Sequence, residues 1–137
     1  TVISGCIGPR GDGYVPAAMM SVRHAEAYHQ PQADALADTE ADMLCAMTLN
    51  YAEEAIGIAH AARRAGMPIA ISFTVEIDGR LPTGQTLGSA IQVVDASERT
   101  ATLRGCALGA AATGNPGAGG GVGAAAGAAA GALSNAG

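Results

Sequence analysis

Three short apolar runs alternate along the chain with longer segments whose apolar residues recur at helical spacing. The runs are rich in β-branched residues, which predicts three strands at residues 1–7, 42–48 and 68–75. The helical spacing predicts three helices at residues 21–38, 52–64 and 86–96. Because strands that alternate with helices form right-handed βαβ units, the pattern predicts an α/β fold with a parallel sheet.

The expected starts of two helices carry capping residues. Ser21 is suited to cap the first helix, and Pro31 is expected to divide it so that residues 32–38 restart as a second helical turn. Asn50 and Glu53 have the spacing of a capping box at the start of the next helix.

Alternation along the third strand separates two faces. In a barrel, the bulky side of each strand meets the outer helices, and we assign Ile69, Ile71, Phe73 and Val75 to that side. The other side carries Ala70, Ser72 and Thr74 and faces inward. Two interpretations stay open for the hydroxyls of Ser72 and Thr74: they line a pocket, or they bond to the neighbouring backbone inside the barrel.

Charged and histidine side chains of the predicted helices are expected to face solvent. The second helix has acids near its start and bases near its end, in the order that suits the helix dipole: Glu53, Glu54, Arg63 and Arg64. Three histidines lack the spacing of metal ligands, and we interpret them as exposed helix residues: His24, His29 and His60.

Charge argues against two classes of partner. The 137 residues include 7 basic and 12 acidic side chains, for a net charge of −5, and all the basic residues are Arg. An acidic chain is poorly suited to bind nucleic acid or an anionic membrane as its main task.

The cysteines and a glycine cluster give weak chemical signals. Cys6, Cys45 and Cys106 are an odd number of widely spaced residues, so we predict no disulfide framework. We interpret Cys6 and Cys45 as small buried residues of strands, and a reducing cytoplasmic setting follows. The glycines at 8–13 suit a wide loop after the first strand. A phosphate site is the lesser alternative, because the next helix starts well after these glycines and its N-terminus would not reach the anion.

The C-terminal part of the chain has a different composition. No charged residue follows Arg104, and Gly and Ala dominate from there to the end. Loss of the true reading frame near residues 95–104 is the explanation that we favour, since GC-rich coding sequence reads as Ala and Gly in its wrong frames. A flexible linker and a membrane segment with small-xxx-small spacing stay open as alternatives.

Several motifs occur together in a recognisable order. They are ISGCIGPRGDGY at residues 3–14, AEAYH at 25–29 and ADMLCAMTLNYAEEAIGIAHAARRAGMPIAISFTVEIDGRLPTGQTL at 41–87. With these motifs the chain resembles the homocysteine S-methyltransferase family, from about Thr1 to Ala96. The resemblance implies the third to fifth strands of a (β/α)₈ barrel with their helices.

This resemblance implies methyl transfer from a methyl donor to the sulfur of homocysteine. It also implies a zinc ion, held by three cysteine thiolates, that binds the homocysteine sulfur in its thiolate form. The family's zinc cysteines lie in an Asn-Cys pair and in a Gly-Gly-Cys-Cys run, and neither motif occurs in this chain. Cys106 falls near the expected place of the Asn-Cys pair but lacks the preceding Asn, so we do not assign it a role as a zinc ligand.

A further departure lies at the end of the second predicted strand. Many family members have a Glu before the Thr, where it can hold the substrate's ammonium group, whereas this chain has Met47 before Thr48. We predict that Met47, Thr48, Ser72 and Thr74 face the substrate pocket and that Met47 changes which acceptor fits.

We therefore expect an α/β fragment. Residues 1–96 would form three βα units of a partial (β/α)₈ barrel, and residues 97–137 a disordered Gly/Ala-rich tail. The chain alone would bind zinc poorly and show no turnover. The alternative is a non-catalytic half-barrel that is stable only as a homo-oligomer or with a partner fragment, because an open sheet leaves its edges and one face uncovered.

Overall fold

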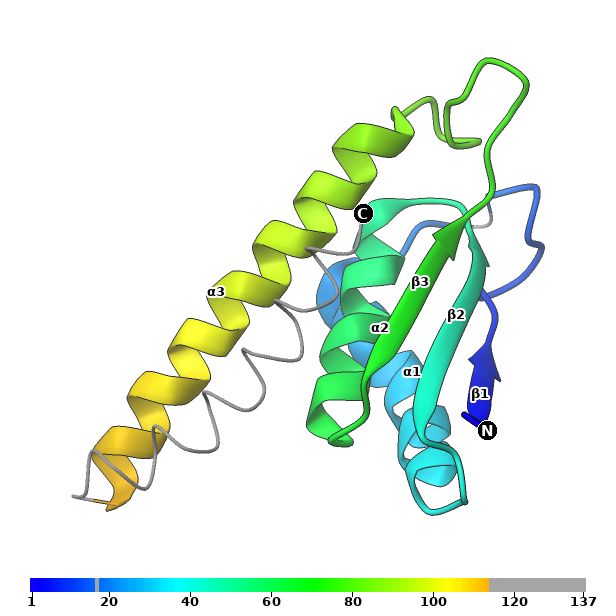
Figure 1. The fold of residues 1–137 in the computed structure, drawn as a ribbon. Coiled ribbons are helices and arrows are strands. Elements are labelled where there is room, and N and C mark those ends of the chain that lie inside the picture. The colour runs from blue at the N-terminus through cyan, green and yellow to red at the C-terminus, as the bar shows by residue number, and fades with distance from the viewer. Residues whose placement is uncertain (17, 114–137) are drawn as a thin grey trace. The chain divides into compact units, whose positions relative to one another are not determined.

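The computed structural model describes residues 1–16 and 18–113, with side chains through residue 100 (Figure 1). Its elements in chain order are β1 (Ser4–Ile7), α1 (Val22–Ala37), β2 (Met43–Leu49), α2 (Ala52–Arg64), β3 (Ile69–Phe73) and α3 (Leu87–Thr113). The chain divides into two compact units at residues 94 and 95, and the site lies wholly in the first unit.

The three strands form one parallel sheet in the order β1-β2-β3. Cys6 pairs with Cys45 in the β1–β2 register, and Cys45 pairs with Ala70 in the β2–β3 register. The predicted alternation of strands and helices and the parallel sheet are thus confirmed.

The core lies between the sheet and the helices α1 and α2, which cover one face of the sheet within residues 1–94 (Figure 1). Ile7, Leu44 and Leu49 are fully buried on that face and pack with Ile58 of α2. Ile69, Ile71 and Phe73 pack against the same cluster, as the alternation of β3 predicts. Val75 was assigned to this layer as well, but it lies beyond the end of β3 and is exposed.

Small residues let the two helices approach each other closely. Gly57 of α2 lies so near to α1 that a Cβ built on it would be 2.4 Å from the Cβ of Ala25. Both residues are buried, so this contact fixes how α1 and α2 lie on the sheet.

Two predicted helix details are wrong. Ser21 caps α1 as expected, but α1 continues through Pro31 as one helix. Because Ala27 and Pro31 are both exposed, the carbonyl that loses its partner at the proline can bond to water. The predicted capping box is absent: Tyr51 is the N-cap residue of α2 and makes no side-chain cap bond, and Asn50 bonds elsewhere.

The third helix is longer than expected. It runs from Leu87 to Thr113 instead of ending at residue 96, so helix replaces part of the tail that was predicted to be disordered. Residues 114–137 lie outside the described part of the chain, and so do the flexible linker and the small-xxx-small membrane segment considered for them. No helix in the described part is long and apolar enough to cross a membrane.

Candidate functional site

The predicted pocket residues come together where β2 and β3 end. The Thr48 N–H donates to Ser72 Oγ at 3.2 Å, and Ser72 Oγ lies 3.6 Å from Met47 Sδ. Thr74 Oγ1 donates to the Gly13 carbonyl at 2.7 Å. Both hydroxyls therefore bond to backbone groups, and they lie at the carboxyl ends of the strands, where βα barrels hold their sites.

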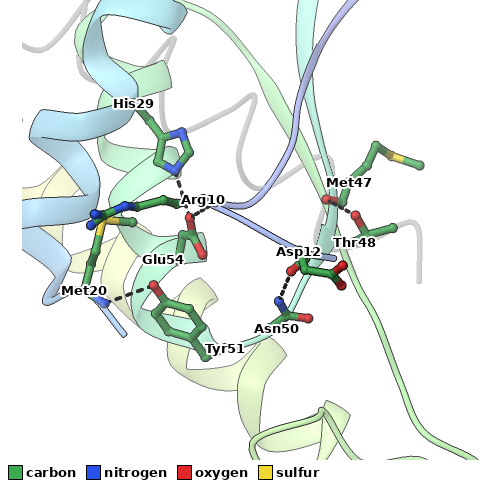
Figure 2. Close-up of polar contacts among 9 residues, drawn as sticks. All are labelled: Arg10, Asp12, Met20, His29, Met47, Thr48, Asn50, Tyr51 and Glu54. Carbon is green, nitrogen blue, oxygen red and sulfur yellow. Dashed lines mark hydrogen bonds and ion pairs between the residues drawn. The ribbon is translucent and has the colours of Figure 1, made fainter. Parts of the chain in front are cut away.

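Thr48 adopts a backbone conformation that β-branched residues rarely take. Its φ is +57°, in the left-handed region, and the β2–β3 register shifts between Ala46 and Leu49 around it. Strain of this kind is concentrated at functional sites. Met47 and Thr48 are both exposed at this turn (Figure 2). Ser72 contacts both of them.

A buried carboxylate holds the loop between β1 and α1. Glu54 Oε1 accepts a hydrogen bond from the Arg10 N–H at 2.7 Å and lies 3.0 Å from His29 Nε2. Figure 2 shows the Glu54 side chain between His29 and Tyr51. His29 and Glu54 were predicted to be exposed, and both are buried because α1, α2 and the loop meet around them.

Tyr51 holds the other end of the same loop. Its hydroxyl accepts a hydrogen bond from the Met20 N–H at 3.0 Å, and both residues are buried. Burial raises the pKa of the Tyr51 hydroxyl, and the nearby Glu54 carboxylate raises it further, although the Met20 bond opposes this.

Asn50 holds the middle of the loop. Its side-chain amide donates to the Asp12 carbonyl at 2.9 Å, and the Asp12 carboxylate accepts from the N–H groups of Tyr14 and Val15. The loop is therefore fixed at four points beside the exposed Met47 and Thr48, by Asn50, Tyr51, Glu54 and Thr74. Figure 2 shows the first three of these contacts.

This fixed loop and the ends of two parallel strands carry motifs that are characteristic of one family. Residues 1–114 match the family model described as homocysteine S-methyltransferase. The chain belongs to this family. The match reaches residue 114, beyond the end near residue 96 that the motifs indicate. Comparison with curated proteins and with solved structures gives no match.

The residues present do not match the zinc set that this homocysteine S-methyltransferase family implies. The described part of the chain holds no group of three His, Cys, Asp or Glu side chains that could bind a metal ion. Cys6 and Cys45 were predicted to be buried, but Cys6 is exposed and Cys45 is partly exposed, because their side of the sheet faces away from α1 and α2.

The remaining candidates from the sequence are two histidines and the glycine loop. His24 is exposed, as predicted, whereas His60 is partly buried, with its Nδ1 3.6 Å from Glu26 Oε2. Helix α1 begins only at Val22, well after the loop glycines, so its N-terminus does not serve a phosphate site at residues 8–13.

Sequence reasoning missed the residues that hold the loop. Asn50, Tyr51 and Glu54 lie directly after β2, and a polar cluster at the carboxyl end of a buried parallel strand is a signal that could have found them. The two partners of Glu54 lie 25 and 44 residues away in the sequence, so the local pattern does not predict these contacts.

Proposed function

We propose that this chain forms three βα units of a (β/α)₈ homocysteine S-methyltransferase barrel and carries the part that faces the methyl acceptor. The family match over residues 1–114 carries this proposal. It is supported by the strictly parallel order of β1, β2 and β3 and by the cluster of polar side chains at their carboxyl ends.

The acceptor would lie against Met47, Thr48, Ser72 and Thr74. Thr48 and Ser72 offer hydroxyls for the polar groups of homocysteine, and the loop held by Glu54 and Asn50 bounds the pocket. The thioether of Met47 cannot pair with an ammonium group as a carboxylate would, so acceptor selectivity would differ from that of members with Glu at this position.

In the family, zinc supplies activation of the acceptor sulfur. The cysteine motifs that hold it do not occur in this sequence, so we expect no methyl transfer by the 137-residue chain alone. Residues 1–96 would be the barrel part, and residues 97–137 a separate tail. Homocysteine and a methyl donor would be the small-molecule partners, in a cytoplasmic protein.

Metal analysis and a turnover assay test this proposal together. The full chain, purified with zinc present, is expected to hold less than stoichiometric zinc and to form no methionine from homocysteine and S-methylmethionine or betaine. Stoichiometric zinc accompanied by methionine formation would contradict the expected inactivity.

One observation favours the alternative of a non-catalytic half-barrel. Within residues 1–94, the helices α1 and α2 lie on one face of the sheet only, which leaves Cys6 and Met47 exposed on the other. A chain that buries this face against a second copy would sediment as a dimer at all accessible concentrations, whereas the acceptor-binding proposal requires the face to admit small molecules.

A further inference from the structure

Two thiols and a thioether lie together on the sheet face that α1 and α2 leave open. Cys6 of β1 and Cys45 of β2 are register partners. Their chain neighbours Ile7, Leu44 and Ala46 are buried on the helix side, so alternation places both thiols on the opposite face. Neither thiol forms a disulfide.

The spacing of these sulfur atoms suits a shared cation. Neighbouring strands lie about 4.8 Å apart, so the side chains of in-register cysteines stand side by side at roughly that separation. Two metal–sulfur bonds of about 2.3 Å span a similar distance. The third sulfur is close, because Cys45 Sγ lies 3.2 Å from Met47 Sδ.

The donor set selects the kind of metal. Thiolate and thioether sulfurs are soft ligands that favour Cu(I), which is stable with two or three of them. Structural zinc takes four ligands, and the described residues offer no third His, Cys, Asp or Glu beside Cys6 and Cys45. The contact between Cys45 and Met47 therefore points away from zinc and toward a soft monovalent ion.

We propose that Cys6, Cys45 and Met47 form a binding site for a soft monovalent cation of the Cu(I) class. Binding forms two metal–thiolate bonds and one weaker thioether contact, and it releases two thiol protons to solvent without any change of oxidation state. The exposure of Cys6 and the partial exposure of Cys45 give the cation access to both sulfurs. This site does not depend on methyltransferase activity.

The test is a competition titration of the full reduced chain with Cu(I) against a chromogenic Cu(I) chelator, without oxygen. We expect one equivalent of Cu(I) to be withdrawn from the chelator, with thiolate-to-metal charge-transfer absorption in the ultraviolet. Cys45→Ser and Cys6→Ser should each weaken binding by about 100-fold or more, and Met47→Leu by about tenfold. Far-ultraviolet circular dichroism checks that each variant keeps its fold.

Cys106→Ser is the matched control, because it removes a thiol that the proposal leaves out. Its Cu(I) affinity should equal that of the unchanged chain. The proposal is overturned if the folded chain withdraws no Cu(I) from the chelator, if the Cys106 variant loses binding as strongly as the Cys45 variant, or if Met47→Leu has no effect.

Discussion

At the scale of single residues, the site depends on polar side chains buried where α2 begins. Glu54 serves two partners with one oxygen, while its Oε2 and the His29 Nδ1 have no hydrogen-bond partner among the described residues. Buried polar groups are strongly destabilising when they lose a partner. The loop beside Met47 and Thr48 therefore depends on a few side chains.

Replacing Glu54 tests this dependence. Glu54→Ala leaves the buried His29 ring and the part-buried Arg10 N–H without their acceptor, so the free energy of unfolding should fall by about 3 kcal/mol. The neighbouring Glu53 is exposed, and Glu53→Ala should change the free energy of unfolding by no more than about 0.5 kcal/mol. Urea denaturation measures both, and equal effects of the two substitutions would show that the buried contacts contribute nothing.

The raised pKa of Tyr51 predicts a loss of stability in alkali. The unfolded chain gives up this proton near the ordinary pKa of 10.0, whereas the folded chain holds it to higher pH. The folded state is therefore favoured below pH 10, and this contribution is lost as the pH rises through the folded pKa.

Urea denaturation between pH 8 and 11 should show stability falling above pH 10. Tyr51→Phe should remove part of this fall, and it should also lower stability by about 1 kcal/mol at pH 8 because the Met20 N–H loses its acceptor. A variant with the same pH dependence as the unchanged chain would contradict the assignment to Tyr51.

At the scale of elements, the local residue pattern predicts the helices and strands, but it does not predict contacts between residues far apart in the sequence. Residue periodicity predicts the order of strands and helices and the helix-facing side of β3. The residue type of Ser21 predicts its cap on α1. The local pattern does not predict the burial of Glu54, because an acid in the first turn of a helix normally faces water and only the contact with His29 and the β1–α1 loop changes this. Met47, Thr48 and Ser72 lie together as expected, because the carboxyl ends of parallel strands share one edge, and their role in a pocket stays a prediction.

The close contact of α1 with α2 gives a prediction at this scale. Gly57→Ala should lower the free energy of unfolding by about 1–3 kcal/mol, because the new methyl would lie 2.4 Å from the Ala25 Cβ and 2.7 Å from the Glu26 nitrogen. Gly88→Ala in α3 meets no atom within 4 Å and should stabilise the chain by up to about 1 kcal/mol. Thermal unfolding distinguishes them, and a neutral Gly57→Ala would contradict the tight contact.

At the scale of the whole molecule, residues 1–94 are a compact unit that contains the sheet, α1, α2 and the candidate site. The first turns of α3 belong to it, since Val94 packs against the main core cluster and Ala90 is buried with Leu81. The sequence pattern ended the third helix at residue 96, whereas α3 continues to Thr113.

A shortened chain tests whether this unit is independent. A chain ending at residue 96 should unfold in one cooperative urea transition, with a free energy within about 1 kcal/mol of the full chain. Circular dichroism in the far ultraviolet follows the transition. A broad, non-cooperative transition would show that residues beyond 96 are needed for the fold.

The central claim is that the ends of β2 and β3 face a methyl acceptor, and a nitrogen-15 NMR titration of the labelled full chain with homocysteine tests it most directly. We predict amide shifts at Gly13, Thr48, Ser72 and Thr74, with smaller shifts for homoserine, which has oxygen in place of the sulfur. Homocysteine that leaves these four amides unchanged, or shifts residues throughout the chain equally, would contradict the account.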